Sequence, residues 1–379
     1  MTDAPVIVAA CRTPIGTAGR ALAGCTAADL ASAVLVRLHA YLPEGVDLGE
    51  VVLGNCTGPG GDIARVAALQ AGLPSRVPAL TVDRQCASGL AAIALAATVL
   101  RTEAGAVLAG GVESASTAPE RRWPGRGGQP GTRYERAPFA PADVGDPEMG
   151  PAADLVAREA DVTRSGQDAY AARSHARAWA TQQAGGFAGE LVAVGGVERD
   201  ERPRGGLTVE RLARLRPAFG AGGTATAGNS CGISDGAAAV TVIDAAAHAR
   251  LAVPGLRVLA SGTAGVDPNR PGLGLVPAVR AAVDRAGVAL DEIDVVEFNE
   301  AFAGQILACC RELDLDPERV CPQGGAIALG HPWGASGAVL AVRLFAQLVS
   351  GNGGRYGLAA IAAGGGQGVA VVVERVGPR

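Results

Sequence analysis

Short apolar runs and helical patterns alternate along the first third of the chain. Four apolar runs have the length and composition of buried strands: residues 4–10, 50–55, 79–83 and 106–111. Three stretches between them place apolar residues at helical spacing: residues 27–41, 62–73 and 90–102. Strands that alternate with helices are typical of βαβ units, so the pattern predicts a parallel sheet covered by helices.

The last third repeats this order of elements. Four strand patterns occur there: residues 256–262, 294–297, 358–363 and 369–374. Three helical patterns accompany them: residues 276–286, 299–313 and 339–349. The two series match in element order and not in residue identity. They indicate a duplicated α/β architecture of five layers.

The middle of the chain differs from both of these thirds. Residues 117–147 are rich in Pro, Gly and Arg and predict an irregular loop, whereas long helical patterns follow it. A Gly-rich stretch then leads back into a strand pattern near residue 240. We therefore divide the chain into a first half, an inserted loop domain, a return strand that completes the first half, and a second half: residues 1–116, 117–219, 220–250 and 251–379.

Composition argues against several classes of function. The formal net charge of −4 does not favour a nucleic-acid-binding protein, which normally presents a basic surface. The chain has no apolar run of about 18 residues and no secretory pattern at its start, so we expect a cytoplasmic protein without a membrane partner. Arg supplies all 33 of the Lys and Arg side chains, which leaves no lysine for a Schiff base.

Eight cysteines are spread along the chain without a CxxC pair: Cys11, Cys25, Cys56, Cys86, Cys231, Cys309, Cys310 and Cys321. We therefore predict neither a metal site nor a disulfide framework. Cys86 stands apart because it lies at a predicted strand-to-helix junction. Helix N-terminal N–H groups stabilise negative charge, which favours a nucleophilic thiolate there over an inert buried thiol.

Three further positions could take part in chemistry. His331 stands between a glycine and a proline, so the turn sets its direction, and a cysteine with a distant histidine is a known arrangement for an activated thiolate. Asn299 interrupts an apolar junction, either as an oxyanion donor or as a helix N-cap. Gly364 opens a glycine run that either binds an anion through backbone N–H groups or forms a hairpin turn.

Four blocks of the sequence are similar, in order and spacing, to the active-site blocks of the thiolases: residues 84–89, 299–302, 325–337 and 364–368. Supporting similarity covers essentially the whole chain. The resemblance implies the thiolase fold, in which duplicated βαβαβαββ halves form an αβαβα five-layer arrangement with an inserted loop domain. It also implies the reaction, which is Claisen condensation of two acyl-CoAs or thiolysis of a 3-ketoacyl-CoA.

The same resemblance implies catalytic roles for single residues. Cys86 would carry the acyl group, and His331 would take the proton of its thiol. Asn299, through a water, and His331 would form one oxyanion hole. The backbone N–H groups of Cys86 and Gly364 would form the other. Coenzyme A or acyl-CoA would be the substrate, with no tightly bound cofactor, and the protein would be a homodimer or homotetramer.

Four positions are expected on the CoA side of the site: Met149, Phe219, Cys231 and Ser336. Phe219 would pack on the pantetheine. Cys231 stands where the family usually has a serine that hydrogen-bonds CoA, and a thiol is a weaker donor. Glu148 stands where short-chain biosynthetic members tend to carry a histidine, so acetoacetyl-CoA specificity does not follow from the resemblance.

The chain departs from the family at Ala362, where a thiolase normally has a second cysteine that acts as the acid/base. A methyl group cannot transfer a proton, and a general acid/base contributes about 10²–10⁴ in rate. Three accounts are open. The protein passes the acyl group to a non-CoA or decarboxylating acceptor, or another group such as Cys321 replaces the missing thiol. In the third account it is an impaired or engineered variant, or a partner-dependent acyl-CoA-binding subunit.

Overall fold

The computed structural model describes residues 4–377, so the outermost residues of the first and last predicted segments lie outside the described part. Five strands form the sheet of the first half, in the spatial order β4-β3-β5-β8-β1. The two strands beside β3 run parallel to it, and β8 is antiparallel to both of its neighbours. Their bounds are β1 Val6–Arg12, β3 Leu48–Gly54, β4 Ala79–Val82, β5 Ala106–Ser114 and β8 Ser234–Ile243.

The second half repeats this arrangement in the order β10-β11-β12-β9. β10 and β11 are parallel, and β12 is antiparallel to both of its neighbours. A single parallel bridge between Val296 and Val320 occupies the place that β4 takes in the first half. β1 pairs with β9, and this pairing joins the two halves. The repeated strand order confirms the predicted duplication. The bounds are β9 Gly255–Gly265, β10 Val295–Phe298, β11 Tyr356–Ala363 and β12 Gln367–Val376.

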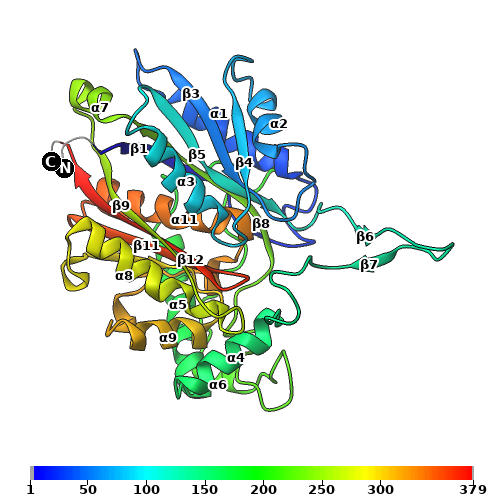
Figure 1. Cartoon of the computed structure of the whole chain (residues 1–379). Helices are drawn as coiled ribbons and strands as arrows, with labels where there is room; N and C mark the ends of the chain where they lie inside the picture. The colour runs from blue at the N-terminus through cyan, green and yellow to red at the C-terminus, as the bar shows by residue number, and fades with distance from the viewer. Residues whose placement is uncertain (1–3, 378–379) are drawn as a thin grey trace.

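Helices separate and cover the two halves of the sheet (Figure 1). Three large apolar clusters mark the interfaces: one under α1 and α2, one around α3 and α11 between the halves, and one under α8 and α9. Alternate residues of β12 enter the central and the outer cluster, as expected for a strand buried on both faces. The five layers are therefore present. The helices are α1 Ala27–Ala40, α2 Ile63–Gln70, α3 Ser88–Val99, α8 Leu275–Ala286, α9 Ala303–Glu312 and α11 Trp333–Phe345.

The inserted segment contains more regular structure than its composition predicts. The hairpin of β6 (Arg121–Trp123) and β7 (Thr132–Tyr134) projects from the body of the protein, with Trp123 stacked on Tyr134 at 4.7 Å between ring centroids (Figure 1). Helices α4 and α5 then pack against α9. The remaining elements are β2 Gly16–Thr17, α4 Met149–Glu159, α5 Arg164–Gln183, α6 Val209–Ala213, α7 Ala245–Leu251 and α10 Ala326–Leu329.

Helix α11 begins at Trp333, six residues before the start that its apolar pattern predicts. The early turns are rich in glycine because α11 crosses α3 there at close range. A Cβ at Gly337 would lie 2.6 Å from the backbone N of Leu90, and one at Gly89 would lie 2.7 Å from the carbonyl O of Gly334. This crossing brings the segments that precede the two helices together, and those segments carry Cys86 and His331.

Residues 333–350 are also long and apolar enough to cross a membrane by length and composition. Of this window, 72% is buried inside the protein. The helix fills the space between the two halves of the sheet, which explains why most of its residues are apolar.

Candidate active site

Cys86 lies in the tight turn between β4 and α3, as the sequence predicts. Gln85 adopts a left-handed backbone conformation with φ 49°, which reverses the chain before the helix starts. The Ser88 hydroxyl holds this turn, because it accepts from the N–H of Arg84 at 2.7 Å and donates to the carbonyl O of Gln85 at 2.6 Å. The thiol therefore lies at the N-terminal end of α3.

Two backbone donors converge on the sulfur of Cys86. Burial raises the pKa of this thiol to about 12, and the carboxylates of Glu113 and Asp83 act in the same direction. The backbone N–H groups of Cys86 and Gly364 act on the thiol in the opposite direction and lower its pKa. The two N–H groups predicted for an oxyanion hole therefore lie near the predicted nucleophile. Formation of the thiolate still requires a proton acceptor.

His331 occupies the turn between α10 and α11, where it is 3% exposed. Its Nδ1 lies 2.5 Å from the hydroxyl of Ser336, one turn into α11. Burial lowers the pKa of the imidazole to about 4, so the neutral form dominates. The backbone N–H of His331 donates to the carbonyl O of Gly232 at 3.0 Å, which places the histidine beside the segment of Cys231. Ser336 therefore faces the histidine and not an exposed CoA surface.

A small cavity of about 30 Å³ brings together two of the four predicted catalytic residues, Cys86 and Asn299, whereas His331 and Gly364 do not line it. Its walls come from six elements of the fold and include Cys86, Met149, Ala152, Ala153, Pro271, Gly272, Asn299, Ala301, Phe302, Gln305 and Ala362. The interpretation of Asn299 as a helix N-cap is wrong, because α9 begins at Ala303 and Phe302 holds the N-cap position. Asn299 instead lines the cavity.

Gly364 begins the turn between β11 and β12, where Gly365 and Gly366 have φ values of 78° and 76°. The glycine run is thus a hairpin turn and also supplies an N–H group to Cys86. An added Cβ at Gly364 would lie 2.6 Å from the ring of Phe139. Glycine is required there because the inserted segment packs directly on the backbone.

Two of the residues predicted for CoA lie at the outer side of the cavity. Phe219 is 41% exposed and forms an edge-to-face pair with Phe302, at 5.8 Å between ring centroids. Its ring also lies directly over Gly150, next to Met149. The backbone N–H of Cys231 donates to Ala301 at 2.9 Å, and the Cys231 sulfur is close enough to Cys86 for their charges to interact.

Cys321 is placed differently. Its thiol is 1% exposed and donates to the carbonyl O of Phe298 at 3.2 Å. Burial and the carboxylates of Glu297 and Glu300 raise the pKa of this thiol well above its usual value. Cys321 does not line the cavity that contains Cys86 and Ala362, so the structure does not support it as the missing acid/base.

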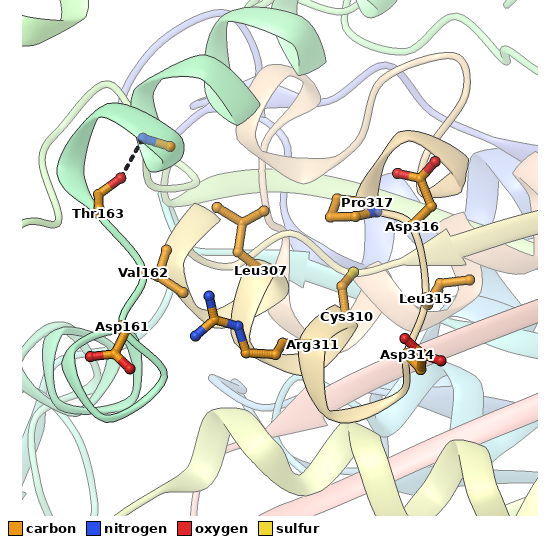
Figure 2. Close-up of a pocket in the computed structure, with 11 residues that line it drawn as sticks. Asp161, Val162, Thr163, Leu307, Cys310, Arg311, Asp314, Leu315, Asp316 and Pro317 are labelled. Carbon is orange, nitrogen blue, oxygen red and sulfur yellow. Dashed lines mark hydrogen bonds between the residues drawn. The ribbon is translucent and has the colours of Figure 1, made fainter.

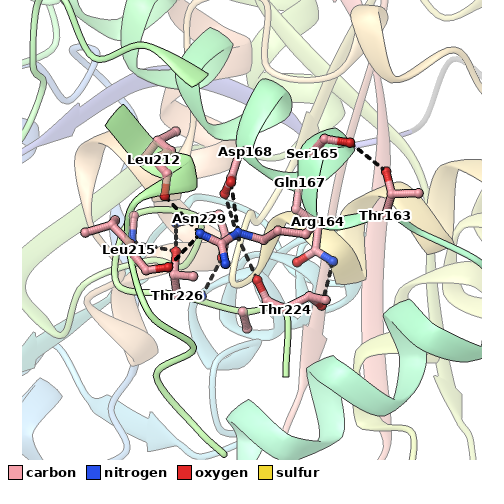
Figure 3. Close-up of polar contacts among 12 residues, drawn as sticks. Thr163, Arg164, Ser165, Gln167, Asp168, Leu212, Leu215, Thr224, Thr226 and Asn229 are labelled. Carbon is pink, nitrogen blue, oxygen red and sulfur yellow. Dashed lines mark hydrogen bonds and ion pairs between the residues drawn. The ribbon is translucent and has the colours of Figure 1, made fainter. Parts of the chain in front are cut away.

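A buried polar network, which the sequence interpretation did not identify, holds the loop between Phe219 and Cys231 (Figure 3). Asp168 on α5 accepts from Nε of Arg164 at 2.8 Å and from Nδ2 of Asn229 at 2.9 Å. The carbonyl O of Asn229 in turn accepts from the first N–H of α9, at Ala303. The sequence signal that could have identified this network is Asp168 itself, an acidic residue on the buried face of a helical pattern.

Glu113 is a second functional position that the sequence interpretation did not identify. Its buried carboxylate accepts from the backbone N–H groups of Cys56 and Thr57, both at 3.1 Å, and from Gly334 at 3.0 Å. Burial raises the pKa of this carboxyl group. The side chain therefore connects the loop after β3 to the first turn of α11. The sequence signal that could have identified Glu113 is a single acidic residue within an apolar strand.

A much larger hollow lies elsewhere, between the end of α4 and the end of α9 (Figure 2). It has a volume of about 750 Å³ and is lined by acidic side chains such as Asp161 and Asp314. Arg311 crosses it and donates to the carbonyl O of Ala160. None of the predicted site residues lines this depression, so the candidate active site is the smaller cavity around Cys86.

Comparisons with known proteins show the family of the chain. Residues 5–246 match the N-terminal domain of thiolases, and residues 253–375 match the C-terminal domain. The chain is 45% identical to a β-ketoadipyl-CoA thiolase of Pseudomonas aeruginosa, over 97% of this chain and 98% of the relative. It is 42% identical to an acetyl-CoA acetyltransferase of the same organism, over 98% and 99%.

A solved structure shows the same fold. The crystal structure of the Bacillus anthracis acetyl-CoA acetyltransferase superposes with a TM-score of 0.92 at 36% sequence identity, and the match covers 99% of each chain. Both halves of the sheet and the inserted segment are therefore shared. The chain belongs to the thiolase family and is an acyltransferase of the thiolase type.

Proposed function

We propose that the protein takes an acyl group from acyl-CoA as a thioester on Cys86 and then passes it to a second substrate. The observation that carries this proposal is the placement of Cys86 at the N-terminal end of α3, where the backbone N–H groups of Cys86 and Gly364 lower the pKa of its thiol. The same donors can stabilise the oxyanion that forms when the thiolate attacks a thioester carbonyl. A covalent intermediate divides one difficult transfer into two easier steps.

Neighbouring residues have distinct roles in this proposal. His331 takes the thiol proton, with its ring held by the hydrogen bond to Ser336. Asn299 holds a water that forms the second oxyanion hole together with His331. Met149 limits the acyl group, because a cavity of about 30 Å³ suits a short acyl chain. Phe219 and Cys231 contact the pantetheine arm of CoA.

Ala362 favours a second candidate for the step that follows acylation. It lines the cavity with Cys86. The similarity of its block to the thiolases implies that this is the position of their second catalytic cysteine. No thiol is available there to remove the α-proton of a second acyl-CoA. An acceptor that forms its carbanion by losing carbon dioxide, or a nucleophile other than an enolate, does not need that proton transfer. We propose such an acceptor as the alternative to ordinary condensation or thiolysis.

Intact-protein mass spectrometry tests the acylation. The protein is incubated with acetyl-CoA and with longer acyl-CoAs, and the modified peptide is mapped. We expect an adduct on Cys86 with short acyl groups, and none in Cys86→Ala. If free CoA removes the acyl group from Cys86 but the protein cleaves acetoacetyl-CoA poorly, the result supports transfer to the alternative acceptor. A chain that forms no adduct with any acyl-CoA contradicts the covalent mechanism and favours a binding subunit.

The setting of the reaction is also a proposal. We infer a cytoplasmic homodimer or homotetramer that uses CoA and acyl-CoA as substrates and holds no tight cofactor. The edge strand β4 supports self-association, because it ends the sheet with Leu80 41% exposed. Light scattering coupled to size-exclusion chromatography gives the number of subunits, and a monomer would contradict this part.

A further inference from the structure

A second, smaller cavity lies behind the candidate active site and shares Asn299 with it. Its volume is about 10 Å³, which is the space of a single water position. The polar residues that line it are Glu297, Asn299, Ser336 and Arg343. Because side chains alternate along β10, Glu297 faces α11 and the interior of the protein.

The polar atoms around this cavity are only partly satisfied by one another. Oε1 of Glu297 accepts from Nε2 of Gln347 at 2.7 Å, and Ser336 is bonded to His331. Arg343 is only 1% exposed, so its Nε is buried, and this atom has no hydrogen-bond partner among the described residues. A buried donor beside a polar cavity of this size is normally satisfied by an ordered water.

We propose that Glu297 is the terminal proton acceptor of the active site, reached from His331 through Ser336 and one water in this cavity. The proposal rests on the roles proposed above for Cys86 and His331. It gives a function to a buried carboxylate that the reaction otherwise leaves unused. Glu297 does not touch the substrate, so it acts only through this chain of hydrogen bonds.

The transfer moves one proton and leaves every other group as it was. The S–H bond of Cys86 breaks, and its proton binds to Nε2 of His331. The imidazole releases the proton on Nδ1 to the hydroxyl of Ser336, and Ser336 releases its own proton to the water. The water passes a proton to the carboxylate of Glu297. When CoA leaves as a thiolate during acylation, the proton returns along the same path to the leaving sulfur.

The pKa values of the two proton acceptors favour Glu297 over His331 as the final site of the proton. Burial lowers the pKa of His331 to about 4, so an imidazolium is a poor resting place for the thiol proton. Burial raises the pKa of Glu297 to about 7, against the opposing effect of Arg343 and of the hydrogen bond from Gln347, and Glu300 adds to the rise. Cys321 is the other titratable group nearby, and it lowers the pKa of the carboxyl group slightly. A proton is thus held more tightly by Glu297 than by the histidine.

Alkylation of Cys86 by iodoacetamide tests the relay without any acyl-CoA. The rate is measured by peptide mapping from about pH 6 to pH 9.5. In the unmodified protein we expect the rate to rise through an ionisation near pH 7, because ionised Glu297 can accept the proton. In Glu297→Gln we expect the rate at pH 7.5 to fall by about 10–100-fold. The step near pH 7 disappears, and the rate instead climbs toward the high pKa of the isolated thiol.

Matched variants separate the relay from a general effect on the fold. Glu300→Gln changes a second buried carboxylate, which is held by Tyr170, Ser174 and the N–H of Ile327 and does not line the cavity. It should keep the step, moved to lower pH because the charge of Glu300 no longer raises the pKa of Glu297, whereas Glu297→Asp should restore part of the rate.

Two results would overturn the proposal: a folded Glu297→Gln protein that keeps the step, or an equal loss of the step in Glu300→Gln. Circular dichroism of each variant establishes that it is folded. If alkylation behaves as expected but acyl-CoA does not acylate the protein, the proposed function alone is refuted and the relay stands. The two failures are therefore distinguishable.

Discussion

The hydroxyl of Ser336 lies 2.5 Å from Nδ1 of His331, and both groups are almost fully buried. This contact fixes the plane of the imidazole and keeps Nε2 free to face a substrate or a thiol. It arises because His331 precedes α11 and Ser336 lies in the first turn of that helix. The histidine is therefore positioned by its own helix and not by a distant carboxylate.

Replacement of Ser336 by alanine should slow acylation of Cys86 by about 10–100-fold, because the imidazole loses the partner that orients it. The KM for acyl-CoA should change little, since the hydroxyl is buried away from the surface. Rapid-quench mass spectrometry measures the rate. Ser230→Ala is the matched control, because the hydroxyl of this buried serine has no partner among residues 4–377. Equal rates in the two variants would contradict the role of Ser336.

Replacement of Ala362 by cysteine should raise the thiolysis of acetoacetyl-CoA by about 10²–10⁴-fold, which is the usual contribution of a general acid/base. The position lines the cavity with Cys86, so a thiol there would reach the α-carbon of a bound acyl group. A spectrophotometric assay of acetoacetyl-CoA follows the change. Ala362→Ser has a similar size and no titration near neutral pH, so it should not rise. An unchanged rate in the cysteine variant would show that the missing thiol is not what limits turnover.

Local sequence signals were sufficient for the positions whose role depends on a single turn. Cys86 was predicted from a strand-to-helix junction, and the structure shows that junction. His331 was predicted from a glycine and a proline on either side, and it lies in the turn that this pattern predicts. The order of strands and helices likewise follows from apolar periodicity, because each element buries its own apolar face.

Positions whose role depends on distant elements could not be predicted in this way. Glu297 is one acid in an apolar strand, and its significance comes from α11, which lies more than 30 residues later in the chain. The start of α11 was misplaced because glycines weaken a helical pattern, whereas the crossing with α3 requires them. Asp168 is similar, since its partner Asn229 belongs to another segment.

Replacement of Asp168 by asparagine should loosen the loop that carries Phe219 and Cys231. The change removes a buried charge that Arg164 and Asn229 both contact, and breaking such a pair costs about 3 kcal/mol or more of the free energy of unfolding. We expect a several-fold rise in the KM for CoA with a smaller change in kcat. Urea denaturation and steady-state kinetics measure the two effects.

The exposed ion pair of Glu159 with Arg270 offers the control for this prediction. Glu159→Gln removes a carboxylate from the surface, where solvent screens the charge, so neither stability nor the KM for CoA should change measurably. A D168N protein with the same KM as the parent would show that the network does not position the CoA loop.

The buried carboxyl of Glu297 should make the fold less stable as the pH rises. Its pKa is about 7 in the folded protein against 4.5 for an ordinary glutamate, so the folded state binds more protons between these values. Its contribution is therefore favourable below about pH 4.5 and is lost as the pH rises through 7. Between about pH 5 and pH 8.5 we expect Glu297→Gln to gain about 2–3 kcal/mol in the free energy of unfolding relative to the unmodified protein. Urea denaturation of both proteins at both pH values gives this difference. Other carboxyl groups that titrate in this range, such as Glu113, contribute equally to both proteins, so their effect cancels. A difference that stays constant with pH would mean that Glu297 is ionised throughout, and the carboxylate could then not serve as a proton store near neutral pH.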